Sequence, residues 1–376
     1  MNAQLKLGEI ITQIRGVSYK PSDVRAAGDP DAVALLRANN IQEDGLNFDD
    51  LVWVDKHKVS AEQYLRMGDI LICSSSGSKG LVGKAAIVTN DLSCAFGAFC
   101  KVVRTKAEYA SYLGQFFRSP RYRKEISASA AGANINNIRN EHIDDMFISM
   151  PSENERAGCV AKLGQIDYLI QKSNNQTHQL DQLVKSRFVE MFGEPITNKM
   201  GWPCLSLVKT CKAILGGGTP SKSHPEYFTG GIPWVSPKDM KYAVISDSID
   251  HITEEAVAHS TTNLVPKNSV LMVIRSGILK HTLPVAINSV PVTINQDMKA
   301  FVPGNGVITE FLMYYFKAIE SDVLAGVRGV TADNIDFKAF QQRKIIAPPL
   351  ELQNRFAAFV AEVDKSKLSY EMEVAA

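Results

Sequence analysis

The sequence of this chain contains an internal repeat, because its two halves align with each other at a nearly constant offset. Residues 36–41 align with 235–240 at an offset of 199, and residues 68–72 align with 268–272 at an offset of 200. Seven such blocks keep the same order, and their offsets drift only between 197 and 200. Because a sequence repeat marks a repeated structural unit, the pattern predicts a tandem duplication of one domain.

Each half shows the same succession of elements. A glycine-rich entry precedes short β-branched runs broken by turn residues, and then come an amphipathic helix, a small strand and a proline that opens a long helix. The amphipathic helices are expected at residues 109–127 and 309–325. This mixture of strands and helices predicts an α+β domain in each half.

A long helix is expected after each domain. The first covers residues 152–192, and its centre, residues 171–179, is polar on every face. About 40 residues at about 1.5 Å each make a helix of about 60 Å, so we interpret it as a spacer. The second helix begins at Pro349. Residues at coiled-coil spacing are Leu163, Ile166, Ile170, Thr177, Leu180, Val184 and Met191 in the first helix and Leu352, Phe356, Phe359 and Val363 in the second.

The predicted organisation is therefore two similar domains separated by long helices. The domains are expected at residues 1–150 and 195–347, the spacer helix at 151–194 and a distal helix at 348–376. If the helices pair antiparallel, the two domains are related by an approximate two-fold axis, with one recognition surface at each end. Duplex DNA is the commonest partner with two sites at a fixed separation, so this arrangement favours a DNA-binding protein with two different half-sites.

Composition limits the class of protein. A hydrophobic content of 45% suffices for real cores, and no run approaches the 18 uninterrupted apolar residues of a membrane helix. The amino terminus lacks the charged segment and apolar block of a signal peptide, so we expect a cytoplasmic protein. The six cysteines form no Cys-x-x-Cys pair and are expected to be reduced core residues rather than metal ligands or disulfide partners.

The formal net charge of +1 gives no global indication of nucleic-acid binding. Locally, residues 101–124 carry seven basic side chains and a single acidic one, Glu108. Such a run is either a solvated helix face or a patch that faces phosphates, and the sequence leaves both interpretations open. The basic residues are Lys101, Arg104, Lys106, Arg118, Arg121, Arg123 and Lys124.

The stretch GGGTPSKSHPEYFTGGIPWVSPKDM, residues 216–240, combines turn residues with aromatic and basic side chains. Its prolines fix φ and stiffen the loop. Lysines such as Lys222 and Lys238 suit phosphate contacts, and aromatic or amide side chains near them suit base edges. The alternative is that Trp234 and Tyr227 simply pack the loop onto its own domain.

These segments resemble a known protein family. Residues 216–240 are similar to the opening of a target-recognition domain in the specificity subunits of Type I restriction-modification enzymes. The stretch PPLELQNRFAAFVAEVDKSK, residues 348–367, resembles the helix that closes such a domain. The first half carries weaker copies of both, LLRANNI and PSENERAGCVAKLGQID. The resemblance covers essentially the whole chain.

The resemblance implies a subunit that reads double-stranded DNA and performs no chemistry itself. Each domain would bind one half of an asymmetric, bipartite sequence, while the helices set the gap and dock two methyltransferase subunits, which restriction and translocase subunits then join. No cofactor is expected on this chain, because S-adenosylmethionine, ATP and magnesium would belong to the partner subunits. The distal helix ends about a dozen residues short of the first, so incomplete pairing is expected at one end. The alternative is an interaction scaffold that does not read DNA, or a truncated, unproductive relic of the family.

Catalytic motifs are missing from the sequence. An adenine methyltransferase needs an Asn or Asp-Pro-Pro-aromatic cluster, and the only Pro-Pro pair, Pro348-Pro349, lies in an apolar stretch. Residues 76–86, SGSKGLVGKAA, nearly match a phosphate-binding loop, but the first glycine is one residue too far from Gly83 and an alanine replaces the hydroxyl that would bind magnesium. We interpret this segment as a glycine-rich turn that faces DNA. The seven histidines show no metal-ligand spacing.

The best candidates for DNA contact are polar residues in the turn-rich blocks of the two halves. Loop conformation decides which of them reach bases and which reach phosphates. The candidates are Ser76, Ser78, Lys79, Lys84, Arg121 and Arg123 in the first domain, and Lys222, Ser236, Lys238, Arg275, Ser276, Lys280 and His281 in the second.

Overall fold

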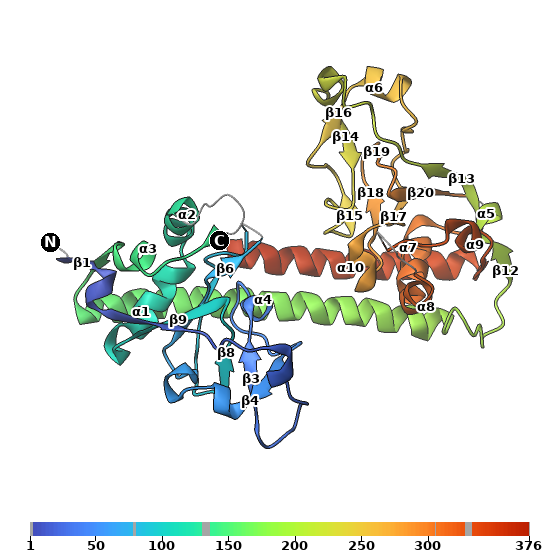
Figure 1. Ribbon diagram of the computed structural model, residues 1–376. Coiled ribbons are helices and arrows are strands. Elements are labelled where there is room, and N and C mark those ends of the chain that lie inside the picture. Colours follow the sequence, from blue (N-terminus) through green and yellow to red (C-terminus); the bar gives the residue numbers. More distant parts are fainter. Residues whose placement is uncertain (1–2, 78–79, 130–135, 305, 328–332, 376) are drawn as a thin grey trace. The chain divides into compact units, whose positions relative to one another are not determined.

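The computed structural model describes residues 3–77, 80–129, 136–304, 306–327 and 333–375 (Figure 1). The chain divides into two compact units, of which the first ends at Ser173 and the second begins at Asn174. Both residues lie in the long helix α4 (Glu153–Phe192), so one continuous helix contributes to both units. None of the helices in the described ranges has the length and hydrophobicity needed to cross a lipid bilayer.

The first unit is built on an antiparallel four-stranded sheet with the order β2-β9-β5-β7. A three-stranded sheet has the order β4-β3-β8, and β1 pairs with β11 and β6 with β10. The strands are β1 (Ala3–Lys6), β2 (Ile11–Arg15), β3 (Ala32–Leu36), β4 (Val52–Asp55), β5 (Ile70–Cys73), β6 (Ser75–Ser76), β7 (Ala85–Ile87), β8 (Cys94–Phe96), β9 (Cys100–Thr105), β10 (Asn136–Asn137) and β11 (Phe147–Met150). The helices before α4 are α1 (Ala107–Arg118), α2 (Pro120–Ser129) and α3 (Glu141–Asp144).

Both faces of the four-stranded sheet are buried. Ile72 of β5 packs in one apolar cluster with Phe117 of α1, and its neighbour Leu71 packs in another cluster with Phe96 of β8. Successive strand residues point to opposite faces, so this sheet lies between the helices on one side and the three-stranded sheet on the other. This burial explains why the strands read as continuous apolar runs in the sequence.

The second unit repeats this plan with a five-stranded sheet of order β13-β20-β17-β18-β15, a three-stranded sheet of order β16-β14-β19, and a β12-β21 pair. Its strands are β12 (Cys204–Ser206), β13 (Cys211–Gly216), β14 (Ile232–Val235), β15 (Val244–Ile245), β16 (His251–Ile252), β17 (Val270–Val273), β18 (Val285–Asn288), β19 (Thr293–Ile294), β20 (Met298–Pro303) and β21 (Lys344–Ile346). Its helices are α5 (Leu207–Thr210), α6 (Glu254–Ala258), α7 (Thr309–Ala318), α8 (Glu320–Ala325), α9 (Phe337–Gln341) and α10 (Leu350–Ala375).

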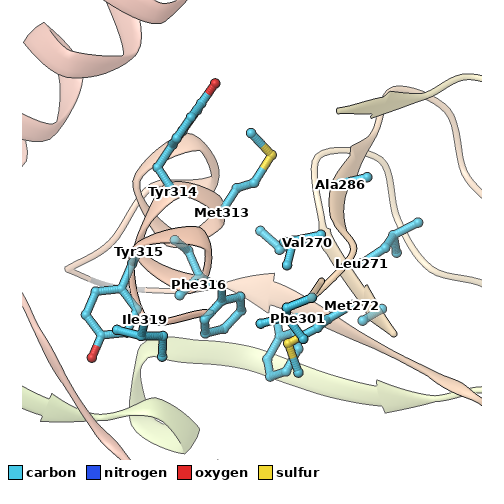
Figure 2. Close-up of a cluster of buried hydrophobic side chains, with 14 of the residues drawn as sticks. Val270, Leu271, Met272, Ala286, Phe301, Met313, Tyr314, Tyr315, Phe316 and Ile319 are labelled. Atoms are coloured by element: carbon cyan, nitrogen blue, oxygen red, sulfur yellow. The ribbon is translucent and has the colours of Figure 1, made fainter. Parts of the chain in front are cut away.

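The core of the second unit forms where α7 covers the sheet. Figure 2 shows Phe316 of α7 turned towards Phe301 of β20, and the two ring centroids lie 4.9 Å apart in an edge-to-face arrangement. Both side chains are fully buried, as is Val270 of β17 beside them. An aromatic pair of this geometry stabilises a core beyond the area it buries.

Strand registers confirm the tandem duplication. In the first unit, β5 and β7 pair Ile70 with Ile87, and in the second, β17 and β18 pair Val270 with Ile287, which is an offset of 200 in both strands. In each three-stranded sheet the central strand runs antiparallel to one neighbour and parallel to the other. The two halves therefore share one topology and one register as well as scattered sequence identities.

The second part of α4 and the helix α10 form the predicted antiparallel pair. The rings of Phe188 and Phe356 lie 5.4 Å apart, and nearer the other end Lys367 donates to Asp181 at 2.7 Å. Later residues of α10 thus contact earlier residues of α4, so the two helices run antiparallel. The most buried positions of α4 here are Val184, Phe188 and Phe192, so the contact recurs every four residues, and the sequence-based seam missed the two phenylalanines.

The two amphipathic helices were each predicted as one element and are each divided in two. The first breaks at Ser119, because the next residue, Pro120, has no N–H to donate and its ring disfavours a helical residue before it. The second breaks at Ile319, where ψ is 9° although no proline follows. Ile319 is buried in the core, so tertiary packing rather than local sequence sets this second break.

The six cysteines are all free thiols, as expected, but they do not share one environment. Cys73, Cys94 and Cys100 are buried in the first unit, and burial raises the pKa of the Cys94 thiol to about 11. Cys159 and Cys204 are exposed, so the expectation that all six are core residues is wrong for these two.

Candidate nucleic-acid interface

In the first unit, four loops converge on one hollow of about 970 Å³. They contain residues 17–19, 37–39, 75–77 and 97–100, and we call them together the loop edge of this unit. Phe99 is the most exposed aromatic side chain of the edge, at 70%. An exposed aromatic ring beside polar side chains in a concave surface suits a ligand with flat faces and hydrogen-bonding edges, such as a nucleic-acid base.

The loop edge has an equivalent in the second unit, fixed by one turn that both halves form. The backbone N–H of Arg37 donates to Oδ1 of Asn40 at 2.8 Å, and that of Ser236 donates to Oδ2 of Asp239 at 2.8 Å. These are the residues that the sequence alignment pairs at an offset of 199. A second bond is also shared, since the N–H of Val17 donates to Phe96 and that of Gly218 donates to Ile294. By this correspondence the second loop edge comprises residues 218–220, 236–238, 275–277 and 295–298.

The predicted contact residues of the first unit fall into different environments. Ser76 lines the hollow at the loop edge. Lys84 lies away from it, with its ammonium 3.5 Å from the carbonyl oxygen of Ile41. Ser78 and Lys79 lie outside the described residues.

The two predicted arginines of the first unit hold the chain itself. Arg123 donates to the carbonyl oxygens of Val82 and Gly80, both at 2.8 Å, and so fixes the glycine-rich turn. Arg121 pairs with Glu125 at 3.0 Å and donates to the carbonyl oxygen of Phe147. Because most of these donors already have partners, structural roles account for both side chains, and their contact with DNA stays a prediction.

In the second unit, Lys222 and Lys238 are exposed, whereas Ser236 is buried and its hydroxyl donates to Asp239 at 2.9 Å. Lys238 lies between the two anchors of the turn, where a side chain is free to vary. It also lines a shallow hollow of about 340 Å³ together with Lys241.

The remaining candidates of the second unit lie after β17. Arg275 pairs with Asp297 at 2.6 Å, and Ser276 begins a short 3-10 helix (Gly277–Lys280). Lys280 lies 3.8 Å from Asp333 and keeps 66% of its side chain exposed. His281 follows directly and is exposed. Arg275 and Ser276 belong to the second loop edge, and the other two border it.

The aromatic residues of 216–240 pack the loop onto its own unit. Trp234 Nε1 donates to the carbonyl oxygen of Gly218 at 3.0 Å, and its ring meets Phe228 edge to face at 5.9 Å. Tyr227 is only 9% exposed, in a small cluster with Ile252. The alternative interpretation, that Trp234 and Tyr227 pack the loop onto its own domain, therefore describes both rings.

The basic run 101–124 was interpreted either as a solvated helix face or as a patch that faces phosphates. Neither interpretation describes most of its side chains. The guanidinium of Arg104 donates two hydrogen bonds of 2.7 Å to the carboxylate of Asp69, and this contact raises the pKa of Arg104. Arg118 pairs with Asp167 of α4 at 2.6 Å. These side chains are internal clamps, so the run is neither a wholly solvated face nor a continuous phosphate-binding patch.

Four large side chains of the first loop edge line the hollow and were not among the predicted contacts. The duplication would have found two of them, because Arg37 and Asn39 align with the candidates Ser236 and Lys238. Phe99 has no such signal, because its aligned position is Asp297. The four are Tyr19, Arg37, Asn39 and Phe99.

A separate apolar surface lies on the first part of α4. Ile166 is 50% exposed, and Tyr168, Leu169 and Ile170 are also exposed. Several large apolar side chains in one short stretch of exposed helix are typical of a docking surface. Across the described ranges, no group of three or more His, Cys, Asp or Glu side chains is placed to hold a metal ion.

Sequence comparison places this architecture among known proteins. Residues 209–373 match the family model of the Type I restriction modification DNA specificity domain. A 152-residue segment is 41% identical to the Type I restriction enzyme EcoR124I/EcoR124II specificity subunit of Escherichia coli, covering 40% of this chain and 38% of that protein. A 192-residue segment is 35% identical to the EcoKI specificity subunit of Escherichia coli strain K12, covering 51% of this chain and 41% of that protein. These comparisons identify a Type I restriction modification DNA specificity domain at residues 209–373 and similarity to Type I specificity subunits over part of the chain.

The fold is similar to that of a solved structure. The crystal structure of a Type I restriction-modification system S subunit from M. genitalium superimposes with a TM-score of 0.52 at 12% identity, covering 99% of this chain and 92% of that one. At this identity the likeness concerns the fold alone. The chain spans about two fifths of the length of the curated specificity subunits it matches.

Proposed function

We propose that this chain is the DNA-reading specificity subunit of a Type I restriction-modification complex. Each unit reads one half of a bipartite sequence through its loop edge. The observation that carries the proposal is the duplicated turn, in which the same hydrogen bonds hold Ala38-Asn39 in one unit and Pro237-Lys238 in the other. One backbone frame with different side chains is what two readers of different half-sites require.

The proposal includes two methyltransferase partners and no chemistry on this chain. The exposed apolar stretch of α4 around Ile166 and Leu169 supplies a surface for helix-to-protein docking. Restriction and translocase subunits join through that complex. S-adenosylmethionine, ATP and magnesium are then bound by the partner subunits, which carry out methylation, translocation and cleavage in the cytoplasm.

The decisive experiment maps methylated bases across the genome in cells with and without this chain. With the chain present, we expect methylation confined to one bipartite sequence, with two specified halves and an unspecified gap. Without it, this methylation is expected to disappear while the methyltransferase is still produced. A methylation pattern that does not depend on the chain would favour the alternative, a scaffold that assembles proteins without reading DNA.

We expect the length of α4 to set the gap between the half-sites. The helix is continuous through its polar centre, and Asn174 and Asn175 are exposed there. Four residues inserted after Asn175 lengthen a helix by about 6 Å and rotate the rest of the helix by about 40° from a whole turn. One base-pair step is about 3.4 Å. The mapped gap should therefore grow by one or two base pairs while both half-sites stay the same.

The matched control for the insertion replaces Asn174 and Asn175 with alanine, which alters the same surface without changing the length. This variant should methylate the original sequence. If the insertion variant keeps full activity and an unchanged gap, α4 does not measure the DNA.

A further inference from the structure

Two lysines occupy the same place in the duplicated fold. Lys101 of β9 is paired with Arg15, the last residue of β2, and Lys299 of β20 is paired with Gly216, the last residue of β13. Each lysine also lines a hollow, of about 500 Å³ in the first unit and about 670 Å³ in the second. The two hollows share a further aligned pair, Asn137 and Asn334.

Lys101 is a buried cation that touches only neutral groups. Its side chain donates to Oε1 of Gln13 and to Oδ1 of Asn140, both at 2.8 Å, and the residue is 8% exposed. An ammonium has three donors, and the third has no partner among the described residues. The nearest carboxylate in this network, Asp144, accepts from Gln13 instead. Burial lowers the pKa of Lys101 to about 8, which reflects the cost of holding a charge here.

A second positive charge stands directly opposite. Arg15 faces Lys101 across the strand pair and lines the same hollow, and its side chain is exposed. Like charges opposite each other destabilise a sheet. The other polar side chains of the hollow include Ser74, Ser75 and Asn137, which are neutral. An anion in the hollow would relieve the repulsion and supply the acceptor that the Lys101 ammonium lacks.

In the second unit, the equivalent lysine, Lys299, has different neighbours. The Lys299 ammonium lies 5.0 Å from the ring centroid of Phe337 and only 2.9 Å from where a Cβ would stand on Gly216. Glycine thus leaves room for the ammonium at the position that arginine occupies in the first unit, and the aromatic ring stabilises the charge. The surroundings differ between the units, but the lysine stays in the same place.

We propose that these two equivalent hollows each receive a DNA backbone phosphate, held by Lys101 and Arg15 in the first unit and by Lys299 in the second. This inference rests on the proposed DNA-reading function. A phosphate is preferred to a base because the two units read different sequences, and the contact that both would keep is the one that carries no sequence information. A lysine at the same point of both units sets the register of each unit on the DNA backbone, while the loop edges supply the specificity for the base sequence.

The test measures the DNA affinity of the 376-residue chain as a function of salt concentration, for Lys101→Met, Lys299→Met and the double variant. Each phosphate contact contributes about 0.9 to the slope of log K against log salt. We expect the slope to fall by about 0.9 for each single variant and by about 1.8 for the double. At 0.1 M salt each single loss should weaken binding about eightfold, equally for the methylated sequence and for an unrelated duplex.

Lys106→Met is the matched control, because it removes the same charge at an exposed position just beyond the other end of β9. Its slope should equal that of the wild type. Equal slope losses for Lys106→Met and Lys101→Met would indicate a general charge effect and would overturn the inference, as would a loss confined to one base of the target. Lys299→Met provides an independent test in the other unit if thermal denaturation shows that Lys101→Met has lost its fold.

Proton linkage gives a second readout. A bound phosphate favours protonated Lys101, whose pKa in the free chain is about 8, so wild-type affinity should fall as pH rises from 7 to 9, more steeply than for Lys101→Met. The charged groups around Lys101 are Arg15 on β2 and Glu141 and Asp144 on α3. Wild-type chain that binds no DNA would refute the proposed function itself, whereas wild-type binding with unchanged variant slopes would refute only the phosphate sites.

Discussion

Under the proposed function, exchanging residues 200–347 for the matching segment of a Type I specificity subunit is expected to abolish methylation of the original sequence and to create a new one that differs in one half only. The exchange moves a complete set of strands. Its two ends meet in the structure, where β12 pairs with β21 and the N–H of Ala347 donates to the carbonyl oxygen of Pro203 at 2.7 Å. The helices α4 and α10 stay native, so the gap between the half-sites should not change.

Base-resolution mapping of methylation measures the result. The reciprocal control exchanges residues 3–150 and should change the other half. Methylation that changes in both halves after one exchange, or that vanishes although the chimera assembles with the methyltransferase, would contradict independent recognition by the two units.

Replacing Phe356 with alanine is expected to lower the free energy of unfolding of the second unit by about 3 to 5 kcal/mol. Phe356 is fully buried, and its ring meets those of Phe188, Phe192 and Tyr314 at 5.4, 5.6 and 5.3 Å. Truncation would leave a cavity among three aromatic rings, at the point where α10 joins α4 to the core.

Chemical denaturation followed by fluorescence measures this loss. Leu368→Ala is the control, because Leu368 lies on the same helix and is 57% exposed. We expect that change to stay within about 0.5 kcal/mol of the wild type. A Phe356→Ala variant no less stable than Leu368→Ala would mean that α10 is not part of the core.

The features that repeat in the sequence were predictable from it. The alignment of 36–41 with 235–240 anticipated the shared turn, and the offset of 200 anticipated the shared register of β5 and β17. A weak local pattern that occurs in both halves is stronger evidence than the same pattern in one half, which is why the turn and the strand register could be predicted. The helix bounds near Ser152 and Pro349 were also close, because a proline precedes both starts and Ser152 caps the first helix. The four-segment division of the chain stays a prediction.

Features that depend on packing were not visible in the sequence. Phe188 and Phe192 follow Val184 at intervals of four, so a seven-residue template skipped them. Nothing in the sequence shows which carbonyl oxygens come within reach of Arg123, and its bonds to Gly80 and Val82 depend on the folded position of α2. Lys101 looked like one member of a basic run and is instead buried beside the core.

Under the proposed function, the shared turn also bears on how new specificities arise. Its shape is held by the residues at its ends, Arg37 with Asn40 in one unit and Ser236 with Asp239 in the other, and both bonds begin at a backbone N–H. The side chains between the anchors take no part in those bonds. Asn39 and Lys238 are exposed, whereas Ala38 packs against an apolar cluster of its unit. Random mutation at positions 39 and 238 can therefore sample new surface chemistry while the end bonds hold the turn. These two positions form the natural starting point for a combinatorial library.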